Sequence, residues 1–427
     1  MDLKVERSDL GGSVRIPASK SHTIRGVILG TLADGTSILA NPLDAADTHS
    51  AVACCRTLGA RIEREGDHWS IDGIDADLPT EPCSVDVGNS GTTLGNLLGV
   101  CAAGEAPITL DGDASIRTRP FGPLLQSLEQ LGATIEATGP KGMTPITVRG
   151  PLTGGEATID GTTSIYLTPL LVACPLAVGR SVLRVDGVMN EQGYVRMTLD
   201  WLEQAGVSVS ANESLTHVEI RGGQRYRPVN RPIAADFSSA AFPACAAVLA
   251  GTEDVDLLGL DFGDTQGDKV VFDILREMGA RFDFGTAVTV HPTDGLKGRR
   301  IDLSGAPDAL PVLSVVACAA EGETILENVE MARIKETDRI AVMRQELAKM
   351  GADIEERRDG LVIRGGTLTG AVVDGHDDHR VIMALAVAGL IADGSTTVRG
   401  ADAMQITYPT FIESMRSLGA RIAASEE

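Results

Sequence analysis

The sequence predicts an α/β protein of six similar β-α-β-α-β-β units, three in each of two lobes. Three observations predict this class: a short block that recurs six times, two kinds of helix-like segment, and β-branched runs between them. The block reads apolar residue, glycine, small residue, and its glycines lie 73, 74, 73, 72 and 68 residues apart. It occurs at Leu58-Gly59-Ala60, Leu131-Gly132-Ala133, Ala205-Gly206-Val207, Met278-Gly279-Ala280, Met350-Gly351-Ala352 and Leu418-Gly419-Ala420. Coincidence would not hold this period six times.

One helix of each unit comes directly before this block. Residues 272–278 are an example, with apolar side chains at helical spacing. Gly279 follows at the position where helices commonly end in the left-handed conformation, which glycine adopts without strain. We therefore expect each of the six glycines to end a helix and to lead into a strand.

The other helix of each unit is almost wholly apolar, as in residues 310–320 and 381–392. A helix that is apolar all round is buried rather than merely facing the core. A glycine turn and a β-branched strand follow, as at Asp393-Gly394 before Thr396-Thr397-Val398. Asp34-Gly35 and Glu321-Gly322 stand in the same place in two other units. Each unit therefore has one helix inside and one outside.

The length predicts the two lobes. A chain of 427 residues is too long for one hydrophobic core, so three units per lobe is the natural division. The stretch Arg227-Pro228-Val229-Asn230-Arg231-Pro232 lies near the middle and is rich in proline. It is the best candidate for a linker.

Composition excludes several classes of partner. A net charge of −22 argues against nucleic acid and against an anionic membrane surface. The seven cysteines have no metal-ligand spacing, and most lie in apolar segments, which is typical of core thiols in a reducing compartment. No apolar run reaches 18 residues, and there is no phosphate-binding glycine motif. We expect a cytoplasmic protein without a metal or a cofactor.

Polar residues open the apolar helices, although a purely structural helix would not need them. Such residues are also ordinary helix caps, so a single start decides nothing. Helix starts bind phosphate and carboxylate readily, and Lys20, Arg25 or Arg380 beside several starts favours ligand binding. The starts are Ser19-Lys20-Ser21-His22, Gly88-Asn89-Ser90-Gly91-Thr92-Thr93, Thr162-Thr163-Ser164, Asp236-Phe237-Ser238-Ser239, Pro307-Asp308 and Asp377-Asp378-His379-Arg380.

A second set of candidate residues lies where the outer helices begin. It comprises Arg117-Thr118-Arg119-Pro120, Tyr194 and Lys335-Glu336-Thr337-Asp338-Arg339. Arginine captures carboxylate or phosphate through two parallel hydrogen bonds. Asp308 and Glu336 are candidate acid–base carboxylates, although Glu336 is equally typical of a first helical turn. Together the two sets predict an enzyme that handles two anionic substrates.

These residues give the chain its resemblance to a known family. The sequence resembles the enolpyruvyl transferases, and among them the EPSP synthases, along its whole length. The matching motifs are Pro17-Ala18-Ser19-Lys20-Ser21 with Arg25, Gly88-Asn89-Ser90-Gly91-Thr92, Arg119-Pro120, Lys335-Glu336-Thr337-Asp338-Arg339 and Asp378-His379-Arg380. The resemblance implies an inside-out α/β barrel of three repeats in each lobe. It also implies a monomer whose lobe I is residues 1–18 and 231–427, whose lobe II is residues 19–230, and whose hinges lie near 15–20 and 227–232.

The resemblance further implies a reaction. A hydroxyl of a phosphorylated alcohol, the 5-hydroxyl of shikimate 3-phosphate, adds to C2 of phosphoenolpyruvate while C3 is protonated. The tetrahedral intermediate then loses inorganic phosphate. Carried over residue by residue, phosphoenolpyruvate is held by Lys20, Gly91, Arg119, Arg339 and Arg380, and the acceptor by Ser21, Arg25, Thr163, Ser164, Tyr194, Asp308 and Lys335. Asp308, Glu336 and Lys20 are the implied catalytic residues.

Three positions depart from the family pattern on the acceptor side. Gly95 stands where the family usually has arginine, Ile165 where it has glutamine, and Glu191 where it has serine. A carboxylate at position 191 would repel the acceptor's phosphate at close range. The phosphoshikimate reaction in chorismate biosynthesis nevertheless remains the first interpretation. A relative acting on another phosphorylated or anionic alcohol in specialised metabolism is the second.

Two further interpretations are open on the sequence. A non-catalytic binding homologue is one, but it would have no reason to keep both Asp308 and Glu336. The peptidoglycan branch, which uses a UDP-sugar, is the other. It is disfavoured because Asp113-Ala114-Ser115 stands where that branch usually has a cysteine.

Overall fold

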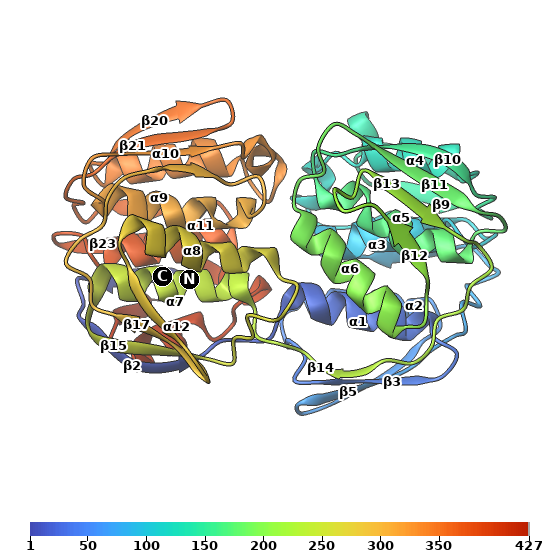
Figure 1. Cartoon of the computed structure of the whole chain (residues 1–427), viewed down its shortest axis with the longest axis horizontal. Helices are drawn as coiled ribbons and strands as arrows, with labels where there is room; N and C mark the ends of the chain where they lie inside the picture. Colours follow the sequence, from blue (N-terminus) through green and yellow to red (C-terminus); the bar gives the residue numbers. More distant parts are fainter. Residues whose placement is uncertain (426–427) are drawn as a thin grey trace. The chain divides into compact units, whose positions relative to one another are not determined.

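The computed structural model describes residues 1–425, which form two compact units (Figure 1). The first unit combines Met1–Pro17 with the chain from Ala235 onward, and the second is Ala18–Ala234. Each unit contains three four-stranded sheets. The predicted α/β class, with six units in two lobes, is confirmed. The hinge positions remain a proposal.

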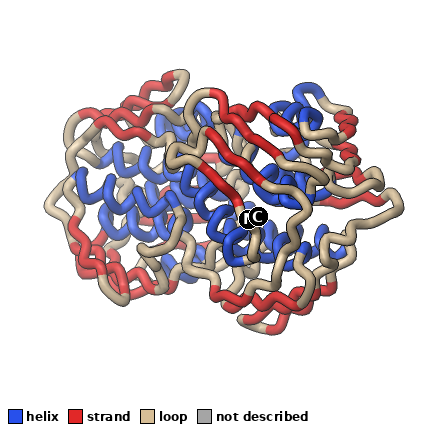
Figure 2. The backbone as a smooth tube through the Cα atoms, turned by 45° about the vertical axis from the view of Figure 1, so that its right-hand side comes forward, coloured by secondary structure: helices blue, strands red, loops and turns tan. Residues whose placement is uncertain are grey.

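The apolar helices are buried, as their composition predicts. In the first unit α7, α9 and α11 pack against one another, and nearly every residue of each is buried. The strands lie toward the outside of each unit, and helices lie beneath them (Figure 2). The six helices are α1 (Lys20–Leu32), α3 (Gly91–Cys101), α5 (Thr168–Ala173), α7 (Phe237–Ala250), α9 (Leu310–Ala319) and α11 (His379–Gly389).

The other six helices are amphipathic and end as predicted. They are α2 (Ala46–Thr57), α4 (Gly122–Gln130), α6 (Gln192–Gln204), α8 (Val270–Met278), α10 (Arg339–Lys349) and α12 (Phe411–Ser417). The glycine after each of them has a positive φ, from 76° at Gly206 to 119° at Gly279. A side chain there would be strained, so the recurring glycine is a requirement of the backbone.

All six sheets have the same topology, a parallel pair followed by two antiparallel strands. In the first unit they are β22 (Val372–Asp374), β23 (Ser395–Arg399), β1 (Asp2–Glu6) and β24 (Arg421–Ser425); β2 (Leu10–Arg15), β15 (Gly251–Leu258), β17 (Ala287–His291) and β16 (Arg281–Phe284); and β18 (Arg300–Asp302), β19 (Glu323–Glu327), β21 (Gly360–Arg364) and β20 (Asp353–Arg357).

The second unit repeats this arrangement. Its sheets are β14 (Asn230–Pro232), β3 (Thr36–Ala40), β5 (His68–Asp72) and β4 (Arg61–Glu65); β6 (Cys83–Asp86), β7 (Ile108–Asp111), β9 (Ile146–Arg149) and β8 (Thr134–Ala137); and β10 (Gly155–Asp160), β11 (Ser181–Asp186), β13 (His217–Ile220) and β12 (Val209–Ala211).

Two repeats exchange their first strands. β2 precedes α1 in the chain, yet it pairs in parallel with β15, which follows α7. β14 precedes α7, yet it pairs in parallel with β3, which follows α1. The Pro-rich stretch from Arg227 to Pro232 thus ends in an edge strand of the second unit, where proline is tolerated.

The third repeat departs from the expected long apolar helix. The chain forms a 3₁₀ turn at Ser164–Tyr166, the six-residue α5, and a second 3₁₀ turn at Cys174–Leu176. Pro169 stands in the first turn of α5, where its missing N–H has no partner to lose. Pro175 follows directly after the helix, within the second turn. The helix therefore starts at Thr168, four residues after Ser164.

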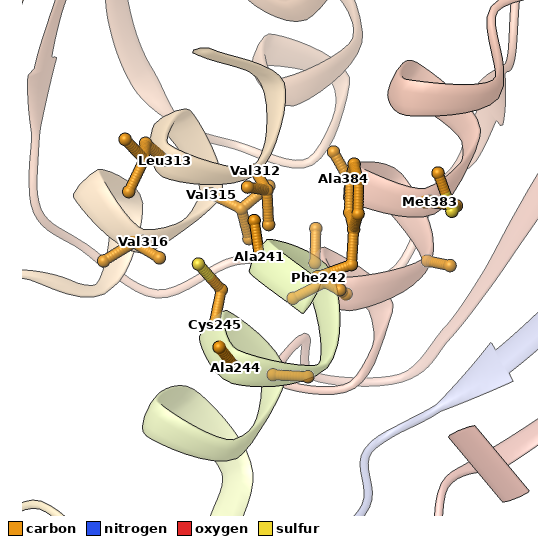
Figure 3. Close-up of a cluster of buried hydrophobic side chains, with 14 of the residues drawn as sticks. Ala241, Phe242, Ala244, Cys245, Val312, Leu313, Val315, Val316, Met383 and Ala384 are labelled. Carbon is orange, nitrogen blue, oxygen red and sulfur yellow. The ribbon is translucent and has the colours of Figure 1, made fainter. Parts of the chain in front are cut away.

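The core of the first unit lies between its three buried helices. Phe242 and Cys245 of α7, Val312 and Val316 of α9, and Met383 of α11 lie in one cluster (Figure 3). All five are almost fully buried. This packing fixes the helix starts, which carry the polar residues of interest, relative to one another.

Candidate active site

The first cluster of predicted site residues lies in the first unit, at the starts of three helices. Asp308 lies in the 3₁₀ turn Pro307–Ala309 that leads into α9. Lys335 and Glu336 lie in the loop before α10, and Arg339 is the first residue of that helix. Arg380 lies in the first turn of α11.

Arg339 is the centre of this cluster and is only 1% exposed. Its Nη1 lies 2.7 Å from Oδ1 of Asp308, and its Nη2 donates to Oε2 of Glu336. Its Nε donates to Oδ2 of Asp378 over 2.8 Å. One guanidinium thus fixes both candidate acid–base carboxylates and a third, fully buried one.

Asp308 is surrounded by three cations. Its second oxygen, Oδ2, lies 3.0 Å from Nη2 of Arg380, and Oδ1 lies 4.0 Å from Nζ of Lys335. Burial raises the pKa of the Asp308 carboxyl, but the charges of Arg380, Lys335 and Arg339 outweigh it and hold the pKa well below its ordinary value. Burial lowers the pKa of Arg339, but Asp378, Glu336 and Asp308 raise it well above its ordinary value.

The second cluster lies in the second unit and begins on α1. Ser19 caps this helix, since its hydroxyl accepts a hydrogen bond from the backbone N–H of His22 over 3.4 Å. Lys20 is the first helical residue, and its Nζ lies 3.1 Å from Oδ2 of Asp47 at the start of α2. Ser21 is buried in the first turn.

Arg25 is buried one turn further along α1, with uncharged partners. It donates to the hydroxyl of Thr198 over 2.8 Å and to the backbone oxygens of Ser21 and Tyr194 over 3.0 and 3.3 Å. Burial lowers the pKa of Arg25 to about 10, with a smaller opposing effect of Tyr194. A buried guanidinium without a carboxylate is suited to receive an anion.

Thr163 and Ser164 are held by Glu191, the residue before α6. Oε2 of Glu191 accepts from the Thr163 hydroxyl over 2.6 Å, from the Ser164 N–H over 2.8 Å and from the Ser164 hydroxyl over 2.9 Å. Tyr194 follows in the first turn of α6. Ser21, Arg25 and Tyr194 thus meet through Arg25, while Thr163 and Ser164 meet at Glu191.

Gly91 and Arg119 also lie together. Gly91 is the first residue of α3, and a Cβ added to it would lie 2.7 Å from Nη1 of Arg119. Only glycine permits so close an approach. Arg119 donates to the Ser115 hydroxyl over 3.2 Å. Their shared role in holding phosphoenolpyruvate stays a prediction.

Sequence reasoning assigned no site role to two carboxylates that contact site residues, Asp378 and Asp47. Asp378 is fully buried, binds Arg339 and caps α11 through the N–H of Arg380. Asp47 binds Lys20. The sequence offered a sign of the role of Asp378, because an aspartate two residues before a site arginine at a helix start is typical of a helix cap next to that site. The sequence offered no such sign for Asp47, because it lies 27 residues from Lys20 in the chain.

Residues 1–425 contain neither a metal-type cluster of side chains nor a helix that could span a membrane. In this range no group of three His, Cys, Asp or Glu side chains has the arrangement of a metal site. In the same range no helix combines the length and apolar character that crossing a membrane requires.

Comparison with known proteins identifies the family. The family model described as EPSP synthase (3-phosphoshikimate 1-carboxyvinyltransferase) matches residues 5–415. Relatives with the name 3-phosphoshikimate 1-carboxyvinyltransferase include one from Acetivibrio thermocellus, 46% identical over all of both chains, and one from Ruminiclostridium cellulolyticum, 44% identical over 99% of both. The structure of EPSP synthase from Acinetobacter baumannii superposes over all of both chains with a TM-score of 0.82 and 27% identity. The chain therefore belongs to the EPSP synthase family.

Proposed function

We propose that this protein transfers the enolpyruvyl group of phosphoenolpyruvate to the 5-hydroxyl of shikimate 3-phosphate and releases inorganic phosphate. One observation carries the proposal: Asp308 and Glu336 are both bound to the buried guanidinium of Arg339, beside Arg380 and Lys335. Family membership and the names of the relatives support it.

Two carboxylates and several cations match the needs of this reaction. Asp308 accepts the proton of the acceptor's hydroxyl as the oxygen attacks C2, and Glu336 delivers a proton to C3. The tetrahedral intermediate then returns a proton from C3 to the Glu336 carboxylate as the bond between C2 and the phosphate oxygen breaks, which releases inorganic phosphate and forms the enol ether. In this proposal Arg339 and Arg380 of the first unit, and Lys20, Gly91 and Arg119 of the second, hold phosphoenolpyruvate. Ser21, Arg25, Thr163, Ser164, Tyr194, Lys335 and Asp308 hold the acceptor.

Substrate binding also prepares Asp308 to act as a base. The three cations around Asp308 hold its pKa well below the ordinary value, which makes the carboxylate a weaker base. The phosphate and carboxylate of a bound substrate compensate the charges of Arg380 and Lys335. The pKa of Asp308 then rises toward the range in which a carboxylate is an effective base.

The test is release of inorganic phosphate from phosphoenolpyruvate by the purified protein, with and without shikimate 3-phosphate. Turnover that depends on shikimate 3-phosphate supports the proposal. Binding of phosphoenolpyruvate without such turnover contradicts it and favours a second candidate, the same chemistry on another phosphorylated or anionic alcohol. The hydrogen bonds of Glu191 to Thr163 and Ser164 are the observation in favour of that candidate.

The proposed function also has consequences for the location, oligomeric state and hinges of the enzyme. We expect a cytoplasmic monomer of chorismate biosynthesis whose two lobes move about hinges near residues 15–20 and 227–232. Size-exclusion chromatography with light scattering tests the monomer, since a dimer would have twice the chain mass of 44.7 kDa.

A further inference from the structure

We propose that Glu191 determines acceptor specificity as an internal competitor: its carboxylate holds the donors that the acceptor's phosphate uses in the proposed reaction. The inference rests on the proposed function, in which Thr163 and Ser164 belong to the acceptor site. It adds that shikimate 3-phosphate must displace the Glu191 carboxylate from these residues before it can bind to them.

The geometry of Glu191 supports a built arrangement. The residue is 2% exposed, and one carboxylate oxygen, Oε2, accepts all three hydrogen bonds, over 2.6 to 2.9 Å. Its backbone has a φ of 52°, which residues other than glycine rarely adopt. The surrounding structure holds this backbone conformation, and the three hydrogen bonds hold the carboxylate at Thr163 and Ser164.

The charge of Glu191 opposes a phosphate at the same place. The hydroxyl protons of Thr163 and Ser164 and the N–H of Ser164 are all donated to the carboxylate, so a phosphate cannot use them at the same time. Two anions at van der Waals distance also repel each other strongly where water is excluded. The acceptor's phosphate can therefore bind to Thr163 and Ser164 only after the Glu191 carboxylate has left them.

An attraction for anions exists in the same unit. Arg25 is buried with only uncharged partners among the described residues, and one of these is the backbone oxygen of Tyr194, three residues after Glu191. The start of α6 thus contains the Glu191 carboxylate, which accepts three hydrogen bonds, and the Tyr194 backbone oxygen, which accepts one from Arg25. Arg25 favours a phosphorylated acceptor, and Glu191 opposes one.

The other two departures from the family pattern are compensated in the packing. A Cβ added to Gly95 would lie 3.0 Å from Cγ1 of Ile165 and 3.5 Å from Pro169, so the Ile165 side chain lies in the space that a side chain at position 95 would need. Ile165 directly follows Ser164 in the 3₁₀ turn. Gly95 and Glu191 thus both adjoin the segment Thr163 to Ile165, so the three departures from the family pattern lie in one part of the second unit.

The experiment is calorimetric binding of shikimate 3-phosphate, and separately of unphosphorylated shikimate, to the wild type and to Glu191→Gln. Glutamine keeps the size and an accepting oxygen but removes the charge. We expect the Kd for shikimate 3-phosphate to fall at least about tenfold and the Kd for shikimate to stay unchanged. Glu203→Gln, the same change at an exposed position of α6, is the matched control and should alter neither Kd.

An unchanged or higher Kd for shikimate 3-phosphate in Glu191→Gln overturns the inference. Equal falls for both ligands also overturn it, because a merely structural effect does not distinguish the phosphate. Should Glu191→Gln fail to fold by circular dichroism, Glu191→Ser replaces it, with the same two criteria.

A double-mutant cycle with Ser164→Ala provides a second criterion. With Glu191 present, the Ser164 hydroxyl is committed to the carboxylate, so its loss costs little affinity for shikimate 3-phosphate. In the Glu191→Gln background the same loss costs more. Additive effects of the two changes contradict the inference.

Binding and turnover separate this inference from the proposed function. Tighter binding of shikimate 3-phosphate by Glu191→Gln without any phosphate release from phosphoenolpyruvate upholds the inference and overturns the function. Normal turnover with no effect of Glu191→Gln on binding upholds the function and overturns the inference.

Discussion

Arg339 and Arg25 are both buried arginines at predicted binding sites, but their surroundings are opposite. Arg339 contacts three carboxylates, those of Asp308, Glu336 and Asp378, and its pKa is raised. Within residues 1–425 Arg25 donates only to uncharged oxygens, and burial lowers its pKa to about 10. In the structure Arg339 is thus compensated by carboxylates of the protein itself, including both candidate acid–base residues, whereas the charge of Arg25 has no such compensation among the described residues.

The largest expected effect comes from replacing the arginine that has counter-ions. Arg339→Met leaves one buried carboxylate, Asp378, and two partly buried ones, Asp308 and Glu336, without their shared cation. We expect the free energy of unfolding to fall by about 3–5 kcal/mol and phosphate release to be abolished. Urea denaturation measures the first and the phosphate assay the second. A stability close to that of the wild type would mean that the ion pairs around Arg339 cost as much in desolvation as they return.

The next effect concerns the candidate base. Asp308→Asn keeps the shape of the side chain but cannot accept a proton. We expect kcat for phosphate release to fall about 10²–10⁴-fold with the circular dichroism spectrum unchanged. Asp353→Asn, an exposed change on β20 of the same unit, is the control, and its kcat should equal that of the wild type. An unchanged kcat in Asp308→Asn would favour a non-catalytic homologue.

Arg25→Met gives the opposite pattern from Arg339→Met. The replaced guanidinium has no carboxylate to leave behind, so we expect the free energy of unfolding to change by about 1 kcal/mol or less. The Kd for shikimate 3-phosphate should rise about 10²-fold, because a buried cation facing the ligand is lost. Equal losses of stability in the two arginine variants would remove the distinction between them.

The pH dependence of stability tests the surroundings of Asp308. Its pKa in the folded protein is lowered, so the stabilisation is fully present above the unfolded value of about 4 and declines as the pH falls below it. We expect the difference in unfolding free energy between the wild type and Asp308→Asn to be constant from pH 7 to about pH 5 and to shrink at lower pH. A difference that grows on acidification would mean that the pKa of Asp308 is raised instead.

The smallest effect concerns Gly95 and Ile165 in the second unit. Gly95→Ala gains helix propensity but brings a Cβ to 3.0 Å from Ile165. We expect the alanine to be more favourable by about 1 kcal/mol in the Ile165→Ala background than in the wild type, measured by urea denaturation of the four proteins of the cycle. Additive effects would mean that the two positions are not coupled.

The repeating helices could be predicted from the sequence because their ends depend on local chemistry. The six glycines end helices because of a backbone requirement that a short segment contains entirely, and Asp378 or Ser19 caps a helix within three residues of its own position. The buried helices follow from composition, since apolar residues on every side exclude an exposed face. The candidate site residues at the helix starts could be named for the same reason, and the family resemblance assigned their roles.

Contacts between distant segments were decided only by the tertiary structure. β2 and β14 exchange their places because strand pairing depends on edges that are open in space, which no local pattern encodes. Asp47 reaches Lys20 for a similar reason, across the packing of two helices. The sequence showed that Glu191 is unusual, but only the fold brings its carboxylate to Thr163 and Ser164, because the orientation depends on where α6 and the 3₁₀ turn meet.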